Sequence, residues 1–260
     1  MNADPVLSTR GLTKRFGTVV VADNIDFDLH AGERAALIGP NGAGKTSFVG
    51  LVSGTIRPDA GGVHLNGQDV TRLRSDHRVK AGLVRTFQIT NLFNKLTVRQ
   101  NLYLPVSERI GASNDIWSPA AGETAIIDEI DDILVRLGLI EDRHRTITEL
   151  PYGRRRLLEI GIALSLRPKV LILDEPAAGL RAEDVILVLD VIGRLPAEMA
   201  MMMIEHDMQV VKRFASRVTV LVRGAVLMTG SPSEVMSADA VRAVYLGRAG
   251  HTRFHDSAHA

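Results

Sequence analysis

The spacing of apolar residues divides the chain into three stretches. In the first, residues 6–29 alternate apolar and polar positions, which predicts β-strands. Short apolar runs at 34–38, 63–67 and 82–87 predict further strands, and the apolar stretch 45–52 predicts a helix. We therefore expect a β-rich start with an antiparallel region at the N-terminus.

The middle stretch has a helical period. Between about 89 and 167, apolar side chains such as Ile126, Ile130 and Leu137 recur at helical spacing, which predicts a helical subdomain. Residues 107–123 are richer in Gly, Ser, Asn and Pro, and we expect a loop or an irregular insert there.

The last stretch alternates short apolar runs with helical segments. The order is strand at 170–173, helix at 182–195, strand at 200–204 and helix at 208–216. This βαβα order predicts an α/β fold with a mostly parallel sheet. The polar end, 248–260, is expected to be a mobile tail.

A Gly-rich loop follows the strand predicted at 34–38. Its sequence, Gly39-Pro-Asn-Gly-Ala-Gly44-Lys45-Thr46, matches the pattern G-x-x-x-x-G-K-[ST] in full. Glycines let backbone N–H groups converge on phosphate oxygens, and the following helix directs its positive end at them. Lys45 would reach the β- and γ-phosphates of a bound nucleotide, and the Thr46 hydroxyl would bind Mg²⁺. The nucleotide-binding residues predicted here are Gly39, Asn41, Gly42, Ala43, Gly44, Lys45, Thr46 and Ser47.

The run at 170–173 ends in two carboxylates. Asp174, at the tip of the predicted strand, would hold Mg²⁺, and Glu175 would act as the general base or orient the attacking water. An acidic residue at a helix start before Pro176 is the alternative. Together with a phosphate loop upstream, the pair predicts a P-loop ATPase or GTPase.

Composition excludes several other classes. The chain has 31 basic and 30 acidic residues, a net charge of +1 that gives no hint of general nucleic-acid binding. It has no cysteine, so disulfides and cysteine-ligated metals are excluded. The N-terminus lacks the regions of a signal peptide, and the longest apolar runs are far shorter than the ~20 residues needed to span a bilayer. If the protein works at a membrane, we expect another chain to hold it there.

Four further segments resemble those of ABC-transporter nucleotide-binding subunits, in matching order and spacing. They are the Q-loop at 85–88, the signature at 150–154, the D-loop at 177–180 and the switch-histidine segment at 204–207. The resemblance covers about residues 7–247. It implies a P-loop NTPase core in a single nucleotide-binding domain, 1–247, with a helical subdomain at about 89–167.

The resemblance also implies roles for single residues. Gln88 would contact Mg²⁺ or the attacking water, His206 the γ-phosphate, and Phe16 would stack on adenine. The catalytic set is thus Glu175, His206, Gln88 and Lys45, and the Mg²⁺ set is Thr46, Gln88 and Asp174. The signature residues Pro151, Tyr152 and Gly153 would meet ATP bound to an opposing subunit. As isolated residues, Phe16 could be core, His206 a hydrogen-bonded strand-end residue and Gln88 a solvated loop residue.

A narrower resemblance points to the branched-chain amino acid uptake subfamily. It is carried by segments 85–89, 174–180, 204–208 and 243–247, and urea and amide importers share much of the pattern. It implies an importer ATPase at the cytoplasmic face of the inner membrane. The implied partners are permease subunits, a second ATPase subunit and, indirectly, a periplasmic solute-binding protein, with no nucleic acid.

Other functions fit less well. A soluble ABC ATPase acting on nucleic acid or ribosomes usually carries tandem cassettes or a long coiled-coil insert. A P-loop GTPase would carry an N-K-x-D-type segment, and none is present. A soft-metal site at Met199–Met203 is less favoured than a buried strand. Metal binding by His251, His255 and His259 is less favoured than a polar tail.

Three residues depart from the family pattern. Pro151 replaces the signature Ser, Arg154 replaces Gln, and Arg181 stands where the wider family has the D-loop Asp. Pro151 has neither a hydroxyl nor a backbone N–H to offer a phosphate. We therefore expect two unequal ATP sites in a heterodimer, with the positive charge of residues 154–156 as partial compensation.

Overall fold

The protein is built on two β-sheets with helices on both sides. The computed structural model describes residues 4–86, 92–111 and 119–246, with the side chains of 119–122 and 246 excepted. The larger sheet has six strands in the order β10-β9-β3-β8-β7-β6. These strands are β3 (Arg34–Ile38), β6 (Leu83–Arg85), β7 (Val170–Asp174), β8 (Ala200–Ile204), β9 (Arg217–Val222) and β10 (Ala225–Gly230). All neighbours in it are parallel except β9 and β10, which confirms the expected mostly parallel sheet.

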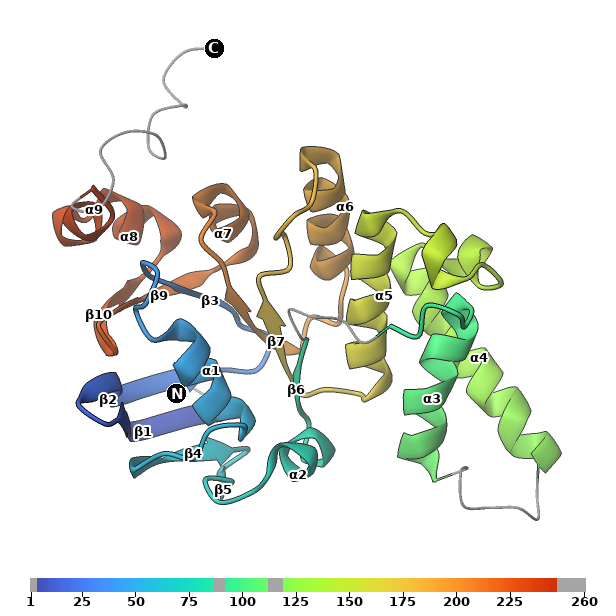
Figure 1. Ribbon diagram of the computed structural model, residues 1–260, viewed down its shortest axis with the longest axis horizontal. Helices are drawn as coiled ribbons and strands as arrows, with labels where there is room; N and C mark the ends of the chain where they lie inside the picture. Colours follow the sequence, from blue (N-terminus) through green and yellow to red (C-terminus); the bar gives the residue numbers. More distant parts are fainter. Residues whose placement is uncertain (1–3, 87–91, 112–118, 247–260) are drawn as a thin grey trace, which may run out of the picture.

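The smaller sheet is antiparallel and has the order β2-β1-β4-β5. Its strands are β1 (Leu7–Phe16), β2 (Val19–Leu29), β4 (Ala60–Leu65) and β5 (Gln68–Asp69). Figure 1 shows this sheet and α1 (Lys45–Ser53) on one side of the larger sheet. Helices α6 (Ala182–Gly193), α7 (Met208–Phe214), α8 (Pro232–Ser237) and α9 (Asp239–Leu246) lie on the other side.

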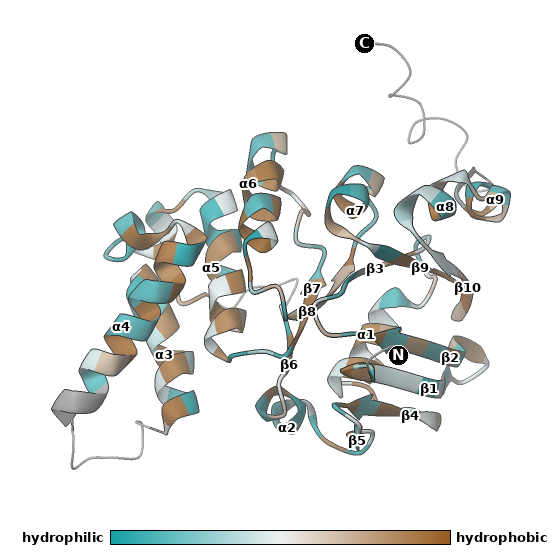
Figure 2. Cartoon of the chain, turned by 180° about the vertical axis from the view of Figure 1, so that it is seen from behind, coloured by the Kyte–Doolittle hydropathy of each residue, from teal (hydrophilic) through white to brown (hydrophobic). Residues whose placement is uncertain are grey.

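The central strands bury both of their faces. In β7, Leu171 and Leu173 belong to the core on the helix side, whereas Val170 and Ile172 belong to the core under the antiparallel sheet. Residues of β8 alternate in the same way, and its buried methionines Met201–Met203 confirm the predicted buried strand. Figure 2 shows these strands as hydrophobic ribbon at the centre of the molecule.

The middle of the chain forms a helical region beside the larger sheet, at the right of Figure 1. It contains α3 (Val98–Ile110), α4 (Pro119–Leu137), α5 (Tyr152–Ser165) and the short 3-10 helices η2 (Ile140–Asp142) and η3 (Ile147–Glu149). Short helix α2 (Ser75–Lys80) precedes β6. The apolar faces of α3, α4 and α5 share one core, which explains the helical period of the sequence.

The prediction of an irregular insert at 107–123 was wrong at both ends of this range. Helix α3 continues to Ile110, and α4 already begins at Pro119. Proline suits the first turn of a helix, and Gly111 with φ 77° ends α3, so both residues mark helix boundaries rather than a long loop. Within the described ranges, no helix is both long and apolar enough to cross a bilayer.

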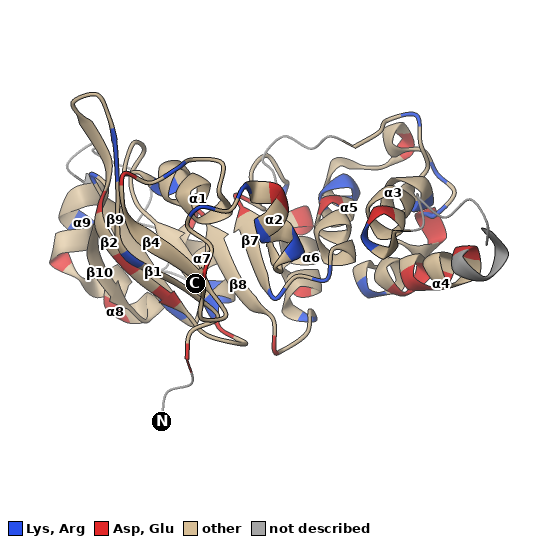
Figure 3. Cartoon of the chain, turned by 90° about the horizontal axis from the view of Figure 1, so that it is seen from below, with Lys and Arg blue, Asp and Glu red and all other residues tan. Residues whose placement is uncertain are grey.

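Charges of both signs are interspersed along the helices in the view of Figure 3. This agrees with the net charge of +1, and the predicted absence of a basic nucleic-acid face stays a prediction.

Candidate nucleotide site

The candidate site lies along the edge where the parallel strands end. β3 leads into the phosphate loop, β7 ends with Asp174, and β8 leads into Glu205 and His206. Because parallel strands share a carboxyl edge, the fold brings these segments side by side although they are far apart in sequence. β6 ends on the same edge at Arg85, and the predicted residue Gln88 lies outside the described residues.

Glycines of the phosphate loop are required for two different reasons. A side chain at Gly39 would come within 2.2 Å of the Leu221 carbonyl, and one at Gly44 within 2.3 Å of the Val21 carbonyl. Gly42 meets nothing within 4 Å, but its φ of 77° lies where residues with a Cβ are disfavoured. Gly39 and Gly44 therefore allow the loop to pack closely against neighbouring backbone. Gly42 lies on the open side of the loop.

Lys45 lies inside the loop at the start of α1. Its Nζ donates to the carbonyls of Gly39, at 2.6 Å, and Pro40, at 3.2 Å. Burial lowers the pKa of Lys45, and the negative charge of Glu175 opposes this shift. The two predicted catalytic residues are thus close enough to interact electrostatically. Helix α1 has Gly44 as its N-cap and no side-chain cap, which leaves N–H groups of its first turn without a side-chain acceptor.

Asp174 is almost fully buried at the end of β7. Its Oδ2 accepts a hydrogen bond from Arg85 Nη2 at 2.5 Å, and its backbone N–H donates to Thr86 Oγ1 at 3.2 Å. The guanidinium therefore neutralises the carboxylate from the Q-loop side. Sequence reasoning missed this pair, because the partners are 89 positions apart.

The donor set fits Mg²⁺ bound together with a nucleotide. The Thr46 hydroxyl and the Asp174 carboxylate would supply hard oxygen ligands, and Thr46 is exposed on α1. Among the described residues, no group of three or more His, Cys, Asp or Glu could hold a metal alone. Mg²⁺ commonly keeps its waters and uses one or two protein oxygens plus substrate phosphates, so a sparse set is what its chemistry needs.

Glu205, a buried residue that sequence reasoning missed, links the turn after Glu175 to His206. The backbone N–H of Glu175 donates to Ile204 O at 3.0 Å. Glu205 is 1% exposed, and its carboxylate accepts from the N–H of Ala177 at 3.0 Å and of His206 at 3.1 Å. Burial raises the pKa of Glu205, while these two hydrogen bonds oppose the rise. A carboxylate directly after an apolar strand was the signal available in the sequence.

Phe16 is exposed, which contradicts the core alternative. The ring, at the end of β1, is 53% accessible, and Lys14 Nζ lies 5.3 Å from its centroid. The β1–β2 hairpin that carries Phe16 packs on the phosphate loop where Val21 meets Gly44. The hairpin therefore lies beside the loop, and the Phe16 side chain on it is open to solvent.

The signature segment begins helix α5. Pro151 is the N-cap and provides no side-chain cap. Tyr152 is 55% exposed, and a side chain at Gly179 would lie 3.6 Å from its ring. Gly153 admits no side chain, because a Cβ there would lie 2.4 Å from Asp184 Oδ1. The segment thus packs on the turn and the helix that follow Glu175.

The three arginines after it have separate partners. Arg154 pairs with the buried Asp142, and Arg155 donates to the carbonyls of Leu150 and Thr148. Arg156 is only 5% exposed and points toward the backbone at Asp174–Pro176. The expectation that residues 154–156 offer surface charge to phosphates is therefore wrong for Arg156.

The C-terminal helix α9 also reaches the phosphate loop. Burial raises the pKa of Tyr245 to about 12, and a hydrogen bond with the backbone of Gly39 opposes the rise. The sequence marked 243–247 only as a point of family resemblance, and the structure sets its tyrosine against the first glycine of the loop.

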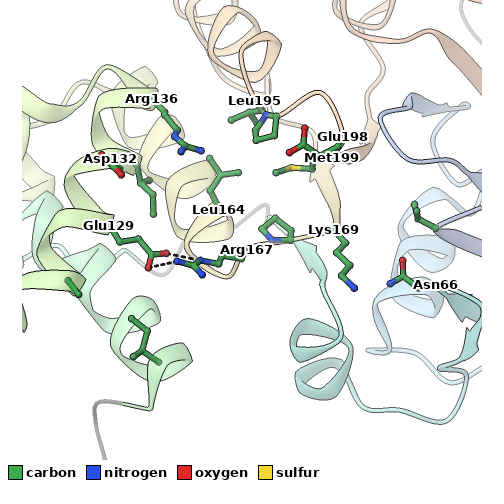
Figure 4. Close-up of a pocket in the computed structure, with 16 residues that line it drawn as sticks. Asn66, Glu129, Asp132, Arg136, Leu164, Arg167, Lys169, Leu195, Glu198 and Met199 are labelled. Carbon is green, nitrogen blue, oxygen red and sulfur yellow. Dashed lines mark hydrogen bonds and ion pairs between the residues drawn. The ribbon is translucent and has the colours of Figure 1, made fainter. Parts of the chain in front are cut away.

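A separate cavity of about 770 Å³ lies at the opposite edge of the larger sheet, as Figure 4 shows. It is bordered by Lys169, just before β7, and by Met199, just before β8, so it faces the amino ends of these strands. On its wall, Arg167 donates to both carboxylate oxygens of Glu129, at 3.2 and 3.0 Å. This cavity does not belong to the candidate nucleotide site.

A phosphate loop between a strand and a helix, at the carboxyl edge of a parallel sheet, defines a P-loop nucleotide-binding fold. The family model described as ABC transporter matches residues 22–178. The chain belongs to the ABC transporter family. As a member of this family, the chain is an ATP-binding ATPase of a transport system.

Individual relatives agree with this assignment. The high-affinity branched-chain amino acid transport ATP-binding protein LivG of Escherichia coli K12 is 33% identical over 254 residues, covering 95% of this chain and all of LivG. Ribose import ATP-binding protein RbsA 1 of Rubrobacter xylanophilus is 34% identical over 96% of this chain but only 48% of its own length. The crystal structure of the ADP conformation of MJ1267, an ATP-binding cassette of an ABC transporter, superimposes with a TM-score of 0.83 at 26% identity, covering 95% of this chain and 100% of MJ1267.

Proposed function

We propose that this chain is the ATPase subunit of an importer for branched-chain amino acids or a similar small polar solute such as urea or an amide. The observation that carries the proposal is the end-to-end match to LivG. The ribose relative has a similar identity, but this chain spans only about half of it. A match over the full length of both chains is the stronger argument for a shared role.

For hydrolysis, we assign separate tasks to the residues along the carboxyl edge. Gly39–Ser47 and the start of α1 would bind the phosphates, with Lys45 adding a charge-assisted contact. Glu175 would take the proton of the attacking water, and His206 and Gln88 would orient that water and the γ-phosphate. The proximity of Lys45 to Glu175 supports placing the γ-phosphate between them.

Mg²⁺ would neutralise charge on the phosphates when bound. Thr46 and Asp174, with Gln88, would be its protein ligands. Asp174 is already paired with Arg85, so the carboxylate is oriented by a hydrogen bond before any cation binds. Phe16 would stack on adenine, which its exposure beside the loop supports.

We propose that two cassettes act together, each offering its signature residues to ATP held by the other. Pro151, Tyr152 and Gly153 are the signature residues of this chain, and the exposure of Tyr152 supports contact with a partner. The domain would comprise residues 1–247, with the helical region at about 89–167 meeting permease subunits. A periplasmic binding protein would deliver the solute, and the chain would sit at the cytoplasmic face of the membrane through its permeases.

The test is solute uptake in the cell that encodes the chain. Deleting the gene should abolish ATP-dependent uptake of labelled leucine, and a plasmid copy should restore it, whereas a Glu175→Gln copy should not. Parallel assays with labelled urea and a short amide separate the substrate classes. Unchanged leucine uptake with loss of urea uptake would reassign the solute, and no change in any uptake would contradict the importer proposal.

A further inference from the structure

The backbone at Glu175 is strained. Its φ is 47°, in the left-handed region that residues with a Cβ rarely adopt. Proline follows it, and a residue before proline is restricted further. Such a conformation is energetically unfavourable and persists only where its surroundings hold it.

One buried guanidinium contacts all three carbonyls around this strained residue. Arg156 Nε donates to Pro176 O at 3.0 Å, and Nη2 donates to Asp174 O at 3.3 Å and also to Glu175 O. Arg156 Nη1 donates to Glu159 Oε2 at 2.5 Å, and that carboxylate, one turn further along α5, balances the buried charge. The guanidinium holds its N–H donors in a fixed planar fork on three nitrogens, whereas lysine has only one donor atom at the end of a flexible stem.

We propose that Arg156 is a positioning residue that fixes the direction of the Glu175 carboxylate and couples it to α5, the helix that begins with the signature segment. The inference rests on the proposed role of Glu175 as the base. Holding the carbonyls of 174–176 fixes the peptide planes on both sides of Glu175, and these planes set where its side chain can point. As a positioning residue, Arg156 would contact neither the nucleotide nor the attacking water and would act only through Glu175.

The coupling follows from where Arg156 sits. It lies five positions after Pro151, on the rigid helix that the signature segment starts. A second cassette that engages the signature segment pushes on α5, and Arg156 carries that movement to the catalytic carboxylate of the same chain. Arg154, in contrast, is tied to Asp142 within the helical region and does not reach Glu175.

The test compares Arg156→Lys with Glu159→Gln in the full chain, assembled with its membrane partners. Arg156→Lys keeps the charge but loses the fork, and we expect kcat to fall about 10–100-fold, because small misplacements of a reacting group can cost that much. ATP affinity, measured by calorimetry, should change less than about twofold, because the phosphate loop is untouched. Glu159→Gln leaves the donors to the carbonyls in place and should keep most of the turnover.

A second comparison separates positioning from mere folding. In a Glu175→Gln background, Arg156→Lys should lower the residual rate no further, because residues that act through one group are not additive. Further loss there, or a normal kcat in Arg156→Lys beside an inactive Glu175→Gln, would overturn the positioning role alone. Wild-type turnover in Glu175→Gln would instead overturn the proposed function of Glu175.

If Arg156→Lys does not fold, the paired replacement Arg156→Met with Glu159→Met removes both buried charges together. We expect this variant to bind ATP and to show the same selective loss of kcat. Its failure to fold would mean that Arg156 serves the core rather than the site, and the proposal would be overturned.

Discussion

The phosphate loop and the signature segment both start helices without a side-chain cap, but they reach this state differently. In the phosphate loop the N-cap is Gly44, whose position beneath Val21 leaves no room for a side chain. In the signature segment the N-cap is Pro151, whose ring supplies no acceptor. Helix α6, which follows the D-loop, has Arg181 as its N-cap and no side-chain cap either.

Three other helices of the described chain have a side-chain cap, whereas α2, with Arg74 as its N-cap, has none. Thr97 caps α3, Asp207 caps α7 and Ser231 caps α8, each accepting a hydrogen bond from a backbone N–H of the first turn. Among the uncapped starts, those of α1 and α5 carry the phosphate loop and the signature segment, where the proposed nucleotide would supply the acceptor. The phosphate loop thus keeps the full family pattern, whereas the signature segment starts its helix without a side-chain cap but with different residues.

Glu175→Gln is expected to have the largest effect on ATP hydrolysis. The amide keeps the shape but cannot take the proton, so we expect ATP hydrolysis to fall at least about 100-fold while ATP binding persists. Phosphate release and nucleotide affinity should be measured on the same preparation. Glu183→Gln, an exposed acid at the start of α6, is the matched control, and near-normal turnover in Glu175→Gln would remove that residue from the base role.

Lys45→Ala should weaken ATP binding about 10–100-fold, because one charge-assisted contact worth roughly 1.5–3 kcal/mol is lost. Calorimetric titration measures this directly. Lys80→Ala, at an exposed site on α2, controls for general loss of positive charge. Unchanged affinity would count against the whole assignment of the phosphate loop.

Pro151→Ser tests the contribution of the signature segment. The serine hydroxyl would add one hydrogen bond to the phosphate held by the second cassette, and we expect ATP affinity at that site to rise by roughly tenfold. ATPase rate and transport should be followed in the assembled complex, with Pro151→Ala separating the hydroxyl from the loss of the ring. If Pro151→Ser and Pro151→Ala behave alike, the two ATP sites do not differ because of this residue.

Arg181→Asp should have the smallest effect, and on stability. An aspartate at the N-cap accepts from the first turn of α6 and suits the positive end of the helix, so the free energy of unfolding should rise by about 1 kcal/mol. Denaturant unfolding of Arg181→Asp beside Arg181→Ala gives the value of the cap itself. Equal stability of the two variants would show that α6 gains nothing from a capping side chain.

Much of the fold follows from local pattern. The strands β3, β7 and β8 were predictable because strands buried on both faces are short continuous apolar runs. The phosphate loop and the acidic pair were predictable because their residues are adjacent in sequence. The ends of α3 and α4 were missed, because Gly and Pro at helix boundaries resemble those of a loop.

The supporting residues of the site were not predictable in this way. Arg156 and Glu205 form hydrogen bonds with backbone groups 18 or more positions away. Arg85, at the end of β6, binds Asp174, at the end of the neighbouring strand β7. Backbone carbonyls and N–H groups are present at every position, so no residue pattern marks which ones a side chain will bind. Only the packing of α5 and β8 against the end of β7 brings these partners together.

The methionine-rich strand β8 has a consequence for oxidative damage. Met201, Met202 and Met203 have no accessible surface, between β3 and β7 at the centre of the sheet. Peroxide can convert a thioether to a polar sulfoxide only when it reaches the sulfur, and three sulfoxides could not be repacked there. Oxidation of these methionines therefore requires the sheet to open. The rate of sulfoxide formation in β8, compared with the rate at the partly exposed Met236, thus reports the rate at which the whole domain unfolds.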